Sequence, residues 1–203
     1  MGPDSLSPEW LLLLAQLPSS PSTARVALWR RLRAIGATGM VTSAWTLPNS
    51  ASHAEFSEQL VETVREQGGD GLVLTVTSPS PDVREAIRRR FRADRAPEYD
   101  EFAERCTVFL DESSKETRAG KFTFAGLEEG EQDLEKLTRW LPKIQARDFF
   151  PDERSSRAEE MLRQCRDAVS SFSREVYAAE GVQEPVGTDQ EGAESASEPG
   201  PEG

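Results

Sequence analysis

The sequence predicts an α+β protein, built from a ferredoxin-like βαββαβ domain, an α-helical extension and a disordered acidic tail. Three observations predict this fold. Short apolar runs typical of strands alternate with helical periodicity over residues 9–80. Residues 81–179 carry apolar side chains at helical spacing. Residues 180–203 contain no aromatic or basic side chain, so burial there cannot offset the entropy cost of ordering.

The predicted domain starts with a strand and a helix. Residues 10–14 form a continuous apolar run, which is the pattern of a buried strand. Ser20 and Pro21 are typical of a helix N-cap and first helical position, and Gly36 ends the helix. Apolar residues at helical spacing are expected to share the face that packs on the core. These residues are Val26, Leu28, Trp29, Leu32 and Ile35.

A hairpin, a second helix and a last strand complete the domain. Residues 39–42 and 44–47 are two short strand candidates rich in Val, Thr and Trp. A capping box at 52–55 opens the second helix, and a glycine-rich turn then leads to a strand over 72–76. The element order is β-α-β-β-α-β, which is the ferredoxin-like arrangement.

The extension is predicted to contain three amphipathic helices and a basic connecting segment. Such helices need an apolar surface to cover, which each other, the sheet or a partner can supply. Pro142 is expected to bend or break the second helix. The three apolar stripes are Tyr99, Phe102, Ala103, Cys106, Phe109 and Leu110; then Leu127, Leu134, Leu137, Leu141 and Ile144; and then Met161, Leu162, Cys165, Val169, Phe172 and Val176.

Composition indicates a cytoplasmic protein. The longest apolar run is far shorter than the ~20 residues that a membrane-spanning helix needs. Glu9 precedes that run where a signal peptide carries positive charge. The two cysteines form neither a disulfide framework nor a metal-ligand pair, as expected in a reducing compartment. We therefore expect no membrane partner, and we expect residues 1–8 to be flexible.

The net charge of −12 is unevenly distributed. Residues 1–95 carry 11 Lys and Arg against 10 Asp and Glu, whereas residues 96–203 carry 13 against 26. The acidic whole argues against nonspecific binding to nucleic acid, but the front half has to be judged by itself.

No catalytic or metal site is predicted, and no cofactor is implied. His53 is the only histidine, and one histidine cannot build a hydrolytic zinc cluster. The glycine-rich turn at 68–71 precedes a strand, so it lacks the strand–loop–helix context of a phosphate-binding loop. The acidic pairs fall at helix ends or polar faces, where carboxylates are normally solvated. We expect a binding or regulatory protein and not an enzyme.

Arginines are the most informative polar residues. Arg25 falls within the apolar sector of the first predicted helix, in its first turn. There, a guanidinium and free amide groups together can bind an oxyanion. The alternative is structural, as an ion pair or as a stem lying over Trp29.

A second group of arginines follows in a run of 12 residues. It can bind phosphates or an acidic partner surface. The alternative is an exposed helix whose arginines pair with Asp82, Glu85, Asp94 or the acidic tail, and both interpretations stay open. The run comprises Arg84, Arg88, Arg89, Arg90, Arg92 and Arg95.

The two cysteines lie on the apolar faces of different predicted helices. Buried cysteine usually packs as a small hydrophobic residue. The alternative hypothesis is that helix packing brings Cys106 and Cys165 together as a redox-sensitive pair.

An ordered series of short motifs extends over residues 10–177 and resembles a known family. It consists of WLLLL at 10–14 with LP at 17–18, RVALWRRL at 25–32 with GA at 36–37, WTLP at 45–48, YDEF at 99–102, KFTF at 121–124, Trp140, and RDFF at 147–150. The series resembles the N-terminal domain of the chromate-resistance protein ChrB family. The front half also resembles the ferredoxin-like domain of PaaX-type repressors and of small CRISPR-adaptation nucleases. Those nucleases use an aspartate near the end of the first strand, where this chain reads LAQL at 14–17, so nuclease activity is not expected.

The resemblance implies a chromate-resistance protein, either a chromate-responsive transcriptional regulator or an accessory factor. Arg25 and Arg30 then become candidates for contact with chromate or another oxyanion, and the arginines of residues 84–95 become candidates for contact with DNA. Longer family members carry a second, C-terminal domain, whereas this sequence ends in the acidic segment. No helix-turn-helix motif is evident. The alternative is a non-enzymatic interaction module that binds a protein partner or a second copy and never DNA.

Overall fold

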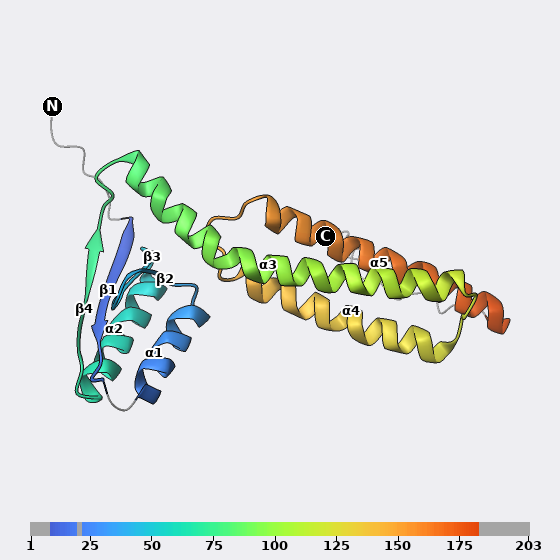
Figure 1. Cartoon of the computed structure of the whole chain (residues 1–203), viewed down its shortest axis with the longest axis horizontal. Helices are drawn as coiled ribbons and strands as arrows, with labels where there is room; N and C mark the ends of the chain where they lie inside the picture. The colour runs from blue at the N-terminus through green and yellow to red at the C-terminus, as the bar shows by residue number, and fades with distance from the viewer. Residues whose placement is uncertain (1–8, 20–21, 183–203) are drawn as a thin grey trace, which may run out of the picture.

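The computed structural model describes residues 9–19 and 22–182. It confirms an α+β fold, in which a small sheet with two helices is joined to three long helices (Figure 1). The predicted flexible N-terminus lies outside the described residues, as do the first helix's predicted cap and nearly all of the predicted acidic tail. Within the described part of the chain, none of the helices combines the length and apolar character that a membrane crossing demands.

The sheet contains four strands in the order β2-β3-β1-β4, and every neighbouring pair is antiparallel. β1 is central: its Leu13 lies opposite Trp45 on one side and opposite Val73 on the other. Both edges of β1 are paired, and its buried Leu11 and Leu13 face the helices, whereas Leu12 and Leu14 on the other face are only half-buried. The strands are β1 (Trp10–Gln16), β2 (Thr38–Val41), β3 (Ala44–Pro48) and β4 (Asp70–Val76).

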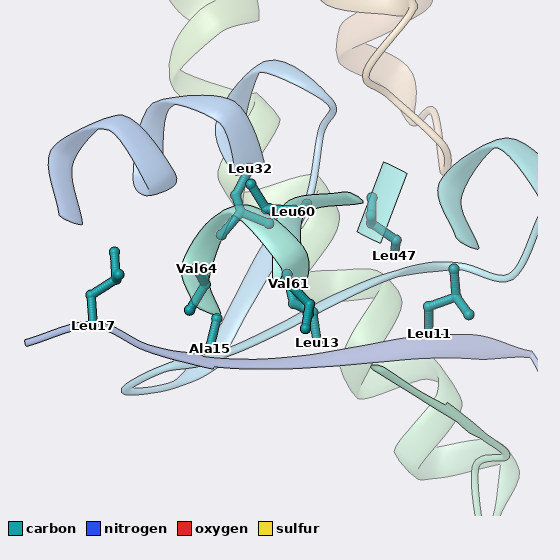
Figure 2. Close-up of a cluster of buried hydrophobic side chains, with 10 residues drawn as sticks. Leu11, Leu13, Ala15, Leu17, Leu32, Leu47, Leu60, Val61 and Val64 are labelled. Atoms are coloured by element: carbon teal, nitrogen blue, oxygen red, sulfur yellow. The ribbon is translucent and has the colours of Figure 1, made fainter. Parts of the chain in front are cut away.

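Two helices, α1 (Ser22–Ala34) and α2 (Ala51–Glu66), cover one face of this sheet (Figure 1). Figure 2 shows Leu11, Leu13 and Ala15 pointing from β1 toward them, in the alternation that a strand imposes. The helices close this core with side chains that are almost wholly buried. These are Leu32 of α1 and Leu60, Val61 and Val64 of α2.

The prediction of which α1 side chains face the core is wrong in part. Leu32 is buried and Leu28 and Ile35 pack against the core, but Val26 and Trp29 are 44% and 51% exposed. The face that meets the sheet is a narrow stripe, because residues three or four apart align along a helix. Val26 and Trp29 turn away from that stripe, so the helix presents apolar surface to solvent.

The start of α2 also differs from the prediction. Ser50, and not Ser52, is the N-cap, and its hydroxyl accepts a hydrogen bond from the His53 amide at 3.2 Å. The ring Nδ1 of His53 lies 2.8 Å from the Pro48 carbonyl oxygen, which fixes the ring beside the end of β3. The cap therefore joins residues three positions apart, as predicted, but it begins at residue 50 and not at residue 52.

The extension is a three-helix bundle of α3 (Pro81–Arg118), α4 (Phe124–Gln145) and α5 (Glu153–Glu180). The three predicted stripes meet one another in its interior, where Phe102, Cys106, Ile144 and Cys165 are fully buried. α3 has 38 residues and extends from the sheet into the bundle (Figure 1). The basic segment is therefore the start of α3 and not a separate connection.

Pro142 does not break α4 at its own position. The helix continues to Gln145, so the proline lies within its last turn. A proline there removes one backbone donor but leaves the rest of the helix intact. The expectation of a break is wrong, whereas a bend at Pro142 stays a prediction.

Candidate functional site

The arginine run of α3 forms the junction between the sheet and the bundle. Arg84 forms an ion pair with Glu9 at 2.6 Å, just before β1. This contact lowers the pKa of the Glu9 carboxyl, because the Arg84 hydrogen bond stabilises its charged form. Further along α3, the guanidinium of Arg88 lies over the Phe150 ring at 5.4 Å. Both arginines are therefore engaged within the fold.

The next two engaged arginines bind backbone carbonyls. Arg90 donates to the carbonyl oxygens of Gly39 and Met40 in β2, at 3.3 and 2.8 Å. Arg92 donates to the Phe150 carbonyl oxygen at 3.2 Å and pairs with Glu85 at 2.8 Å, so one predicted carboxylate partner is confirmed. Arg89 is exposed, and it forms no contact with any residue that the structure describes.

Arg95 is the most deeply buried of the run, with 2% of its surface exposed. Its Nη1 lies 2.7 Å from Glu98 Oε1, but both Nη groups are buried and donate no hydrogen bond. Burial lowers the pKa of this guanidinium. The positive charges of Arg33 and Arg147 also lower the pKa, whereas the negative charge of Glu98 raises it. Glu98 also pairs with Arg147 at 2.6 Å, so one carboxylate serves two arginines.

An aromatic cluster holds the same junction together. Trp10 of β1 stacks on Phe91 of α3 with 6.0 Å between ring centroids, and Phe150 lies 5.7 Å from Trp10 and 5.3 Å from Phe91. The Trp10 indole donates to the Ser78 hydroxyl at 2.7 Å, so its buried N–H is satisfied. Three separate segments of the chain thus meet in one apolar contact.

The arginines of α1 are used differently. Arg25 is exposed and not within the apolar sector, so that prediction is wrong; its Nη1 lies 3.4 Å from the Pro18 carbonyl oxygen. Arg30 is exposed, and within residues 9–19 and 22–182 it forms no hydrogen bond, ion pair or ring contact. Arg33 pairs with Asp94 of α3 at 3.0 Å, and it is this arginine, not Arg25, that lies over Trp29.

Arg25 and Arg30 do not converge on one point. Five residues separate them, which is about 140° around a helix with 3.6 residues per turn. Their roles as oxyanion contacts stay predictions, and their arrangement presents two separate guanidinium groups along α1.

Helix packing does bring Cys106 and Cys165 together. Both are fully buried free thiols, and the Cys165 Sγ lies 3.9 Å from the Cys106 carbonyl oxygen. The neighbouring Cys106 thiol and burial together raise the pKa of the Cys165 thiol. The hydrogen bond from Cys165 lowers the pKa of the Cys106 thiol, but burial shields both sulfur atoms from reagents, so this geometry favours packing, while a redox role stays a prediction.

Two clefts of the bundle are lined by more acidic than basic side chains, and neither is lined by an arginine of residues 84–95. One of 320 Å³ lies between the three helices and is lined by Glu112, Glu116 and Phe172 among others. A neighbouring one of 530 Å³ is lined by Glu101, Arg105 and Trp140 among others. Across the described residues, no three His, Cys, Asp or Glu side chains are grouped as metal ligands.

Comparison with known proteins places this architecture in a family. The family described as Protein ChrB, N-terminal, matches residues 25–183. The chain belongs to the ChrB family. Protein ChrB of Cupriavidus metallidurans (strain ATCC 43123 / DSM 2839 / NBRC 102507 / CH34) is 30% identical over 169 residues, which cover 82% of this chain and 48% of that protein. The chain thus spans about half the length of this ChrB relative.

Two features of this ChrB-family chain were not predicted from the sequence. The first is the pairing of Arg33 with Asp94 and of Arg147 with Glu98, which depends on how the sheet meets the bundle. The second is the exposure of Trp29 beside Arg33. One sequence signal for the second exists: Arg25 and Arg33 lie four residues before and after Trp29, so the three share one helix face.

Proposed function

We propose that this chain is a chromate-resistance protein that acts, without catalysis, as a chromate-responsive transcriptional regulator or as an accessory factor to one. The family match over residues 25–183 is the observation that carries the proposal. The proposed location is the cytoplasm. The proposed partners are chromate or another oxyanion, and DNA.

We further propose that residues 9–80 form a ferredoxin-like domain. The element order β1-α1-β2-β3-α2-β4 and the sheet order β2-β3-β1-β4 support this assignment, as does the placement of both helices on one face. The assignment agrees with the resemblance to the ferredoxin-like domain of PaaX-type repressors.

The junction gives a regulator a physical means of coupling its two parts. α3 is continuous from the sheet to the bundle, and the ion pairs of Arg33 and Arg84 tie α3 to α1 and to the start of β1. If the junction has two arrangements, a ligand that binds the sheet domain or the bundle more tightly in one arrangement shifts the equilibrium toward that arrangement. Because the junction joins the two parts, the shift changes the conformation of both.

Fluorescence anisotropy tests the proposal. Labelled duplex DNA from the region upstream of the protein's own gene is titrated with the purified chain at several salt concentrations. Each titration is repeated with chromate and with sulfate, a tetrahedral dianion of the same charge. Binding that chromate weakens and sulfate leaves unchanged is the expected result. DNA binding that is indifferent to chromate would contradict the chromate response.

The alternative is an interaction module that binds a protein partner and never DNA. The acidic clefts of the bundle favour it, as do Val108 and Phe124, which are exposed on α3 and α4. No DNA binding even at low salt, where phosphate contacts are strongest, would select this alternative.

A further inference from the structure

We propose that the outer face of α1 binds the sugar–phosphate backbone of duplex DNA. This surface, the α1 basic face, consists of Arg25, Trp29, Arg30 and Arg33. The inference rests on the proposed regulatory function and names the surface that touches DNA. It moves the contact from the arginine run of α3, where the sequence predicts it, to a different helix.

Charge is the first argument. The chain has a net charge of −12, yet residues 10–54 carry four arginines and no acidic side chain. All four arginines lie in the 13 residues of α1, which alone among the described helices contains neither Asp nor Glu. A local excess of positive charge on one face attracts a polyanion even when the whole protein is acidic.

The availability of these arginines is the second argument. Arg30 is exposed and has no hydrogen bond, ion pair or ring contact within the described residues, and Arg25 is exposed with one 3.4 Å hydrogen bond to the Pro18 carbonyl oxygen and no carboxylate partner. By contrast, five of the six arginines of the α3 run already contact carboxylates, carbonyl oxygens or an aromatic ring. A guanidinium that is free in the protein can bind phosphate without first breaking an internal contact.

Trp29 supplies the third argument. Its indole is 51% exposed, and the guanidinium of Arg33 lies 5.9 Å from its ring. Val26 is also exposed on this side of the helix. A large apolar ring between guanidinium groups matches the alternation of deoxyribose and phosphate along a DNA strand, because the sugar offers an apolar surface between the charges.

The dimensions and the surroundings of the face agree with this ligand. Arg25 and Arg33 are separated by about 12 Å along the helix axis, which corresponds to roughly three steps of a DNA strand. On the side of α2, the exposed Glu55, Glu58, Glu62 and Glu66 repel phosphate, so the positive surface is confined to the side of α1 that faces away from α2.

A matched pair of double variants tests the assignment in the full chain. The test variant is Arg25→Gln with Arg30→Gln, and the control is Arg157→Gln with Arg166→Gln. The control arginines are also exposed, and they lie on α5 without a described ion pair. Both variants change the net charge equally, so only the position differs. DNA affinity is measured by anisotropy between about 50 and 200 mM salt.

The test variant is expected to bind DNA at least about tenfold more weakly than the unaltered chain. Because two phosphate contacts are removed, the slope of log affinity against log salt concentration should become about 1.8 less negative. The control should stay within about twofold of the unaltered chain. Trp29→Ala should weaken binding about fivefold and leave the salt slope unchanged, because it removes no charge. Circular dichroism checks that each variant keeps its fold.

The outcomes separate this inference from the proposed function. Chromate-sensitive DNA binding that is equal in the test variant and the unaltered chain overturns the α1 basic face and leaves the regulator intact. Equal losses in test and control overturn it as well, because net charge alone then explains binding. If the unaltered chain binds no DNA at low salt, both proposals fail. Binding of poly-glutamate that only the test variant loses would then assign the face to an acidic protein partner.

Discussion

Arginines are abundant both in α1 and at the start of α3, but the fold engages the two groups to different extents. α1 has four in 13 residues, and α3 has six between residues 84 and 95. The α3 group ties the sheet to the bundle, whereas Arg25 and Arg30 of α1 remain in solvent without a described carboxylate partner. The number of arginines on a helix therefore does not locate a binding surface. The groups that the fold places beside each arginine decide its role.

The largest expected effect comes from the aromatic core under the α3 arginines. Phe91 is buried against Trp10 and Phe150, so Phe91→Ala should lower the free energy of unfolding by roughly 3–5 kcal/mol. Trp29→Ala on α1 should change it by less than about 0.5 kcal/mol, because Trp29 is half exposed. Urea denaturation of both variants measures the difference. Similar losses in the two would break the contrast between the helices.

The next effect concerns the carboxylate that serves two arginines. Glu98→Gln leaves Arg95 buried without its counter-charge, so the free energy of unfolding should fall by about 2–3 kcal/mol. This is below the loss expected for a fully buried pair, because the Glu98 side chain is 25% exposed.

Arg95→Met is the matched variant at the same contact. It should cost less than about 1 kcal/mol, because Glu98 keeps its pair with Arg147 and two unsatisfied donors are removed. Denaturation curves measure the free energy of unfolding of both variants. If Arg95→Met is less stable than Glu98→Gln, the Arg95 side chain itself stabilises the fold, which contradicts the expectation.

A smaller effect is expected at alkaline pH. Burial raises the pKa of Tyr99 to about 12, and its hydrogen bond to Asp148 at 2.9 Å adds to the shift. A phenol whose pKa is raised in the folded state stabilises the fold fully below its unfolded pKa of about 10, and this stability is lost as the pH rises toward 12. The unfolding temperature of the unaltered chain should therefore fall more steeply over this range than that of Tyr99→Phe. Parallel curves would contradict the assignment.

No reaction at all is expected from the thiols. Cys106 and Cys165 are fully buried where α3 and α5 pack together. A thiol-specific reagent at neutral pH should leave both unreacted in the folded chain and modify both in denaturant. Rapid reaction of either thiol in the folded chain would support the redox-sensitive pair and would show that α3 opens at its bundle end.

Elements that depend on local pattern were predictable from the sequence. The apolar run of β1 and the three stripes of the bundle determine which side chains are buried, because strand and helix periods are intrinsic to the backbone. The start of each bundle helix is also locally encoded. Ser80, Thr123 and Asp152 each accept a hydrogen bond from a backbone amide of the first turn.

Only the tertiary structure decided the role of each arginine and the exposed side of α1. Arg84 binds Glu9, Arg33 binds Asp94, and Arg147 shares Glu98 with Arg95. Except for Arg95 and Glu98, which lie three residues apart, these partners are distant in sequence, and a long side chain can reach any of several carboxylates that the pattern leaves equivalent. Trp29 and Val26 have the helical spacing of core residues, but a helix that meets a sheet along a narrow stripe leaves them in solvent. The sequence by itself determined the elements and most of their buried apolar positions, and the tertiary packing determined the exposed side of α1 and which arginines stay in solvent.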